Sequence, residues 1–108
     1  MHNVETTDLY EGNVMAKVQG LGKYRLSSVS LSNLQIADYI ELDIRPGSVL
    51  VSINVFGHVS YVHQRSGDLM GFSGADEALA WARGVQVWRS GGWVHLPVRC
   101  IGSEARSA

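Results

Sequence analysis

The feature of this sequence that most constrains its fold is the alternation of apolar and polar residues over positions 39–56, which Pro46-Gly47 interrupts once. Successive side chains of a β-strand point to opposite faces of a sheet, so a period of two predicts two strands that each bury one face. A two-residue loop at Pro46-Gly47 joins them into an antiparallel hairpin. The apolar side chains that this register places on one face are Ile40, Leu42, Ile44, Val49, Val51, Ile53 and Val55.

A third strand is expected to follow over residues 59–65. Gly57-His58 places glycine at the first central position of a type II′ turn, which predicts a second two-residue loop. That loop pairs Ser52 with His63, while the first hairpin pairs Glu41 with Ser52. The face opposite the apolar one is therefore expected to carry a polar row across three neighbouring strands, formed by Glu41, Ser52 and His63.

A serine beside a histidine raises the question of a nucleophile with its general base. In the expected register Glu41 lies beyond Ser52 and not behind His63, so no third group orients the imidazole. A serine in the middle of a strand also has no evident oxyanion hole. We therefore interpret the polar row as a solvated sheet face and predict no catalytic residue.

Residues 74–83 are predicted to form the main helix. Apolar residues at positions i, i+3, i+4 and i+7 form a stripe that can pack on the sheet, with Trp81 beside it. Ser73 is the expected N-cap, and Asp76 lies in the first turn, where the helix dipole favours a negative charge. Leu79 is the largest side chain of the stripe, which consists of Ala75, Ala78, Leu79 and Ala82.

The segment that precedes the alternating run has a weaker pattern. Residues 13–19 and 23–31 are predicted to form strands, separated by a turn at Gly20 and Gly22. Ser32 and Gln35 have the spacing of a capping box, which predicts a single helical turn after the second strand. We expect this segment to contribute mainly strands.

A last hairpin is predicted from residues 85–89 and 93–98 around Ser90-Gly91-Gly92. One of its faces is apolar, and the other is formed by Gln86, Trp88, Trp93 and His95. Trp and Tyr are enriched at the hot spots of protein interfaces, which makes this aromatic face a candidate binding surface. Tryptophans also serve to cover the edge of a core, and the pattern leaves both roles open.

Composition limits the classes of function. Nine Lys and Arg against ten Asp and Glu give a formal net charge of -1, so no basic excess favours nucleic-acid binding. No basic amphipathic stretch or long apolar run indicates a membrane partner. The histidines lack metal-ligand spacing and Cys100 is the single cysteine, so neither a metal nor another cofactor is predicted. The first residues do not have the pattern of a secretory signal, and a cytoplasmic location is expected.

Together these patterns predict an α+β fold in one domain over residues 1–108, with loose tails at 1–10 and 102–108. The expected architecture is an antiparallel sheet of about five to seven strands, open or curled into a half-barrel. One main helix packs on the apolar face of that sheet.

Two hypotheses about function follow. The first is a small non-catalytic interaction module that contacts another protein or a second copy of itself, with a homodimer expected. The alternative is a small-molecule-binding domain or minor enzyme with a cleft near Tyr61, His63, Trp88 and His95. The candidate binding residues from the two hypotheses are Trp88, Trp93, His95, Tyr61 and His63.

Overall fold

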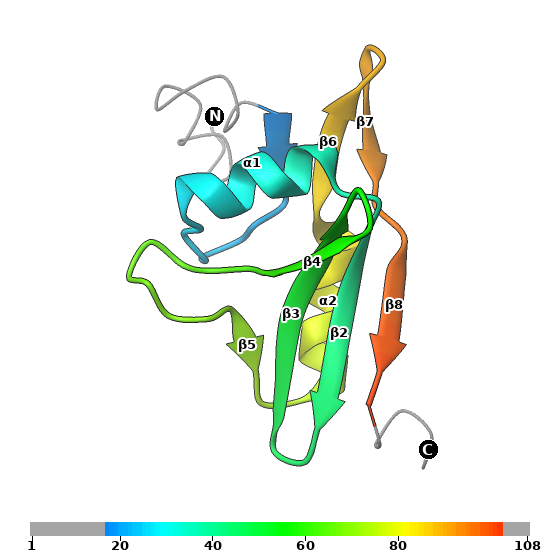
Figure 1. The fold of residues 1–108 in the computed structure, drawn as a ribbon. Coiled ribbons are helices and arrows are strands. Elements are labelled where there is room, and N and C mark those ends of the chain that lie inside the picture. Colours follow the sequence, from blue (N-terminus) through cyan, green and yellow to red (C-terminus); the bar gives the residue numbers. More distant parts are fainter. Residues whose placement is uncertain (1–16, 103–108) are drawn as a thin grey trace.

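The computed structural model describes residues 17–102. This part of the chain is α+β, with two helices and eight strands in two sheets, neither of which closes into a barrel (Figure 1). The predicted tail 1–10, the predicted tail 102–108 apart from Gly102, and residues 13–16 of the first predicted strand lie outside the described residues. In chain order the elements are β1 (Val18–Gln19), α1 (Ser28–Ile36), β2 (Tyr39–Arg45), β3 (Ser48–Val55), β4 (His58–Tyr61), β5 (Gly71–Phe72), α2 (Ala75–Gly84), β6 (Gln86–Arg89), β7 (Gly92–His95) and β8 (Val98–Ile101).

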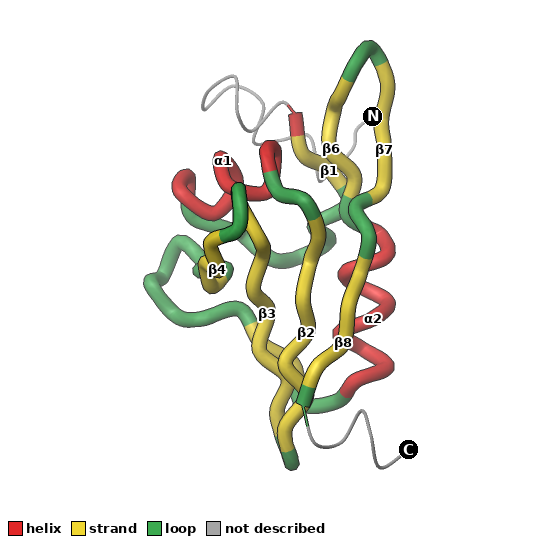
Figure 2. The backbone as a smooth tube through the Cα atoms, turned by 45° about the vertical axis from the view of Figure 1, so that its right-hand side comes forward, coloured by secondary structure: helices red, strands yellow, loops and turns green. Residues whose placement is uncertain are grey.

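The β2–β3 hairpin confirms the prediction from the alternating run. Ile44 pairs with Val49 and Glu41 with Ser52, so the loop is Pro46-Gly47 as expected. The predicted apolar face is the buried face of the sheet, and α2 packs against it (Figure 2). This hairpin is the centre of the larger sheet, whose strand order is β4-β3-β2-β8, with β5 also paired to β3.

The register of β4 differs from the prediction by two residues. Val55 pairs with His58, so the loop is Phe56-Gly57 and not Gly57-His58. Both loop residues have positive φ, 53° and 85°, as a type I′ turn requires, and this turn matches the twist of the flanking strands. The Oδ1 atom of Asn54 accepts the Gly57 N–H at 3.0 Å and stabilises the turn. Alternation of hydrophobicity alone could not choose between the two loops, because a shift of two residues keeps every side chain on its face.

The prediction of a single antiparallel sheet was wrong, because β8 runs parallel to β2 and the described strands form two sheets. The predicted strand 93–98 ends at His95, and the chain then passes into the larger sheet. Pro97 lies just beyond the break and takes no part in the hairpin, whose last pair is Gln86 with His95. The Pro97 carbonyl oxygen instead accepts the Ile40 N–H at 2.8 Å, which begins the pairing of β8 with β2.

Residues 23–31, predicted as a strand, instead lead into α1, so the described chain has two helices. Ser27 caps this helix, with its hydroxyl oxygen accepting the Ser30 N–H at 3.1 Å. The predicted capping box that starts at Ser32 therefore lies inside a helix that has already begun. Leu31 is buried and Val29 is exposed, so the apolar residues of α1 do not form the single stripe that would identify a helix from sequence.

The second helix was predicted in the right place, and Ala78 and Ala82 of the predicted stripe are buried. Its N-cap is Gly74 and not Ser73, and no side chain caps it. Asp76 lies in the first turn, as predicted. Trp81 is buried, whereas Leu79 is only partly buried, so the helix is rotated relative to the predicted stripe.

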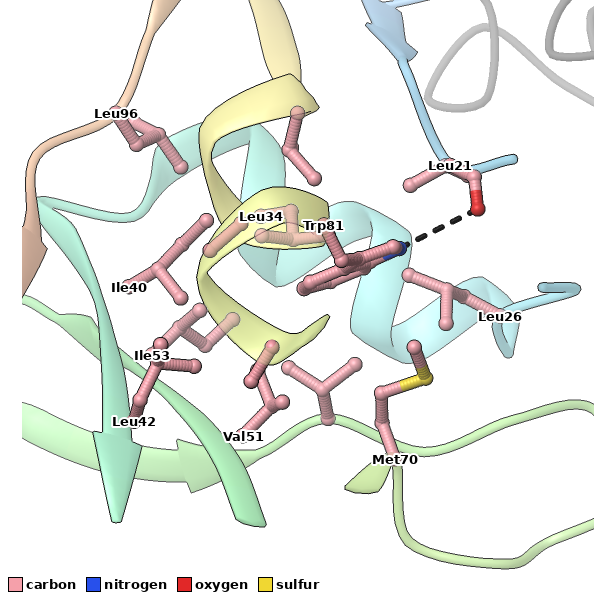
Figure 3. Close-up of a cluster of buried hydrophobic side chains, with 14 of the residues drawn as sticks. Leu21, Leu26, Leu34, Ile40, Leu42, Val51, Ile53, Met70, Trp81 and Leu96 are labelled. Carbon is pink, nitrogen blue, oxygen red and sulfur yellow. Dashed lines mark hydrogen bonds between the residues drawn. The ribbon is translucent and has the colours of Figure 1, made fainter. Parts of the chain in front are cut away.

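Trp81 links α2 to the segment before α1 (Figure 3). Its indole Nε1–H donates to the Leu21 carbonyl oxygen at 3.3 Å, and its ring lies 5.9 Å from that of Phe72 between centroids. Leu26 and Met70 are fully buried in the same cluster. The core therefore extends from the larger sheet through α2 to residues that precede α1.

Candidate functional site

The last hairpin forms the smaller sheet together with β1, in the order β1-β6-β7. The register confirms the predicted aromatic face, because Trp88 pairs with Trp93 and Gln86 with His95. The loop is Ser90-Gly91, and both of its residues have positive φ, 51° and 84°. The type I′ turn that this requires fits the natural twist of a hairpin, so the turn fixes which side chains face each other.

Trp88 and Trp93 form an aromatic pair at the surface. Their ring centroids are 5.3 Å apart and their planes are inclined by 79°, which is an edge-to-face arrangement. Trp88 is 36% exposed and Trp93 is half-buried, and among the described residues neither belongs to the buried core cluster. Of the two roles that the sequence left open, this geometry fits a surface role for the pair.

The hairpin is fixed to the C-terminal end of α1. The Nη2 atom of Arg89 donates to the Gln35 and Ala37 carbonyl oxygens at 2.9 and 2.6 Å. These are carbonyls that the end of a helix leaves without intrahelical partners, and a cation there also interacts favourably with the helix dipole. In return, Gln35 Nε2 donates to the Trp88 carbonyl oxygen at 2.7 Å. The tryptophan pair is therefore held on a fixed support.

Neither Gln35 nor Arg89 can be recognised from the sequence as a residue that positions this surface. Gln35 was expected in a capping box, and Arg89 was expected only as the last residue of a strand. A cationic residue at the end of a strand carries no signal that it will cap a helix more than fifty positions away. This contact could be found only from the tertiary structure.

The outer edge of β7 has no partner strand in the part of the chain that the structure describes. Figure 2 shows β7 on the outer side of the hairpin, which projects from the rest of the molecule. In a hairpin with a two-residue loop, the residues that flank the loop exchange hydrogen bonds, and every second pair along the strands does the same. Gly92 and Val94 therefore bond to β6, whereas the N–H and C=O groups of Trp93 and His95 point outward.

Val94 was predicted on the apolar face with Val87, and the register confirms that the two residues are paired. Val87 is fully buried, but Val94 is 39% exposed, because β7 is the last strand of its sheet. No strand beyond β7 covers this side chain within residues 17–102. The edge therefore presents an apolar side chain on one face and an aromatic one on the other.

Of the other two candidate residues, Tyr61 ends β4 of the larger sheet and His63 follows that strand. Tyr61 is exposed and pairs with Ser52, while His63 forms an isolated bridge with Leu69. The predicted pairing of Ser52 with His63 was wrong, since the loop Phe56-Gly57 shifts the register. Ser52 is only 4% exposed, so the polar row does not present a serine and histidine side by side to a substrate.

The two pairs of candidate residues lie at opposite ends of α1. The His63 N–H donates to the Ser30 hydroxyl in the first turn of that helix at 2.7 Å. The Trp88 carbonyl is bonded to Gln35 in its last turn. The structure therefore does not bring Tyr61 and His63 together with Trp88 and His95 as the lining of one cleft.

Charged side chains on the exposed face of the larger sheet interact with neighbours on that same face. Arg45 Nη2 lies 2.6 Å from Asp43 Oδ2, and this hydrogen bond raises the pKa of Arg45 above its ordinary value. The Arg99 guanidinium lies 4.5 Å from the centroid of the Tyr39 ring in a cation–π contact. Within residues 17–102, no group of three or more His, Cys, Asp or Glu side chains could hold a metal ion.

Comparison with protein-family models, with curated proteins and with solved structures finds no match for this chain. Neither helix of the described residues is long and apolar enough to cross a membrane. The geometry of the hairpin alone therefore defines the candidate site.

Proposed function

We propose that this protein is a non-catalytic interaction module that forms a homodimer through the β6–β7 hairpin. The observation that carries the proposal is a tryptophan pair at the surface, on a hairpin fixed to α1, beside a strand edge that is unpaired within residues 17–102. Tryptophan is among the residues that contribute most to binding when buried at an interface. The edge supplies backbone groups that a second strand can satisfy.

The rigidity of the hairpin supports this role. Binding is opposed by the cost of ordering side chains and loops at the interface. The contacts of Arg89 with Gln35 and Ala37 hold β6 in place before any partner arrives. The edge-to-face contact between Trp88 and Trp93 similarly restricts both rings. A surface that is already ordered loses less conformational entropy on association.

The direct experiment is a concentration series of the purified protein by size-exclusion chromatography with light scattering. The wild-type protein should reach the mass of a dimer at micromolar concentration. Trp93→Ala should weaken association by roughly thirtyfold, because truncation of a hot-spot aromatic costs about 2 kcal/mol or more.

Phe56→Ala provides the matched control. Phe56 is also an exposed aromatic residue in a β-hairpin, but it lies in the larger sheet, in the loop between β3 and β4. This variant should dimerise within about threefold of the wild type, since surface changes away from an interface alter the energy by less than about 0.5 kcal/mol. A wild-type protein that remains monomeric at high micromolar concentration contradicts the proposal.

A further inference from the structure

We infer that the dimer forms by antiparallel pairing of β7 with β7 of a second copy, with the two-fold axis passing at Val94. This inference rests on the proposed function and specifies its geometry. The result is one continuous six-stranded sheet in which each copy contributes three strands in the order β1-β6-β7. A two-fold axis is the commonest symmetry of homo-oligomers, and it requires a surface that is complementary to itself.

The outward backbone groups of β7 meet this requirement in one register. Trp93 and His95 direct both their N–H and C=O groups away from β6. With the axis at Val94, Trp93 faces the partner's His95, and His95 faces the partner's Trp93. Each of these two pairs exchanges two hydrogen bonds, so the interface gains four and leaves no outward group of β7 unpaired.

The neighbouring registers satisfy fewer groups. With the axis at Trp93, only the central pair is bonded, because the next outward position is Gly91 in the turn. With the axis at His95, Trp93 faces the partner's Pro97. Pro97 has no N–H, and its carbonyl already accepts from Ile40. The backbone pattern therefore selects Val94 as the centre.

The side chains agree with this register. Val94 is 39% exposed and meets the partner's Val94 in a non-hydrogen-bonded pair, the closer of the two kinds of antiparallel pair. On the opposite face, Trp93 lies beside the partner's His95, which extends the aromatic row begun by Trp88. The strand has no Lys, Arg, Asp or Glu, so no like charges face each other across the axis. These features fit a second copy of the same strand.

Disulfide cross-linking tests the register directly. In a Cys100→Ser background, Val94→Cys places two thiols across the axis, with Cα atoms about 4.5 Å apart. Mild oxidation should convert most of this variant to a covalent dimer on a non-reducing gel. His95→Cys in the same background is the control, because its two Cα atoms lie diagonally at about 8 Å, beyond the range of a disulfide.

A proline substitution tests the backbone bonds independently. His95→Pro removes an outward N–H from each copy but no hydrogen bond within the hairpin, so the fold should tolerate it. Dimer affinity should fall at least tenfold, since two of the four intermolecular bonds are lost. Cys100→Pro is the matched control. Cys100 lies on β8, an edge strand of the larger sheet among the described residues. Its N–H is expected to point away from β2, because the Pro97 carbonyl bonds to β2 and alternate residues follow.

The outcomes separate this inference from the proposed function. A wild-type protein that stays monomeric contradicts both. A third outcome is a wild-type dimer that Trp93→Ala weakens, while Val94→Cys fails to cross-link and His95→Pro dimerises as tightly as the wild type. This result supports the proposed function. The same result overturns the pairing of β7 with itself.

Discussion

Truncation of Trp81 to alanine should produce a large loss of stability. Trp81 is 8% exposed, contacts the Phe72 ring and donates a hydrogen bond to the Leu21 carbonyl. Loss of a buried tryptophan side chain costs about 3–5 kcal/mol through the transfer and cavity terms. A domain is stable by about 5–15 kcal/mol in total, so Trp81→Ala should remove about a fifth or more of the free energy of unfolding.

Two further variants divide this cost between its causes. Trp81→Phe retains an aromatic ring but loses the indole hydrogen bond, while the Leu21 carbonyl still accepts the Tyr24 N–H at 3.3 Å, so the change should cost about 0.5–1.5 kcal/mol. Leu79→Ala truncates a neighbour on the same helix that is only partly buried. Because part of that side chain is already in water, we expect a loss of about 1–2 kcal/mol.

Equilibrium unfolding in urea, followed by far-UV circular dichroism, measures all three variants against the wild type. Equal m-values would show that the same surface is exposed in each case, so that midpoints can be compared. We expect Trp81→Ala to lose the most free energy of unfolding and Trp81→Phe to lose less. The loss for Leu79→Ala should be close to that for Trp81→Phe. If Leu79→Ala costs more than Trp81→Ala, α2 packs through the face that contains Leu79, and the observed orientation is refuted.

Three further predictions concern a turn, a cap and the buried serine. Gly20→Ala should cost about 3 kcal/mol in urea melts, because the new Cβ meets backbone atoms at the C-terminal end of α2 and the backbone has a positive φ. Gly22 also has a positive φ but has open space around it, so Gly22→Ala should cost about 1 kcal/mol. Equal losses for the two variants would contradict the close approach of Gly20 to α2. Ser27→Ala should cost about 1 kcal/mol through loss of the α1 cap, whereas exposed Ser28→Ala should be nearly neutral in the same assay. A fluorophosphonate probe should not label Ser52, as measured by mass spectrometry, since Ser52 pairs with Tyr61 and not with His63. Stoichiometric labelling would demonstrate an activated hydroxyl.

The parts of the fold that could be predicted are those in which local pattern and burial agree. The β2–β3 hairpin was predicted with its register, because its alternation is nearly continuous and one face is wholly buried. The position of α2 followed from its polar ends and small apolar residues. Its orientation did not, since Trp81 and Leu79 are both apolar and only the tertiary contacts decide which is buried.

The remaining errors have physical causes that lie outside a short window of sequence. The helix α1 is rich in serine and has an exposed valine, so its cap at Ser27 was the only local sign of where it begins. The parallel pairing of β8 depends on a contact between Pro97 and Ile40, which are 57 positions apart. Such non-local pairing cannot be recognised from periodicity.

The candidate site was predicted in part. The alternation of side chains along the last hairpin placed Trp88, Trp93 and His95 on one face, and the structure confirms this shared face. The contacts that support this face, from Arg89 to the end of α1, are tertiary and were not predicted. Within the described residues, the strand order makes β7 the outer strand of the smaller sheet.

Amide hydrogen exchange at increasing protein concentration is the most direct test of association through the β7 edge. The N–H groups of Trp93 and His95 point away from β6 and should exchange quickly in dilute protein. At concentrations where the dimer predominates, both should become protected, while the outward N–H of Cys100 on β8 should exchange at an unchanged rate. Exchange at Trp93 and His95 that stays fast and independent of concentration, up to high micromolar protein, would contradict the account.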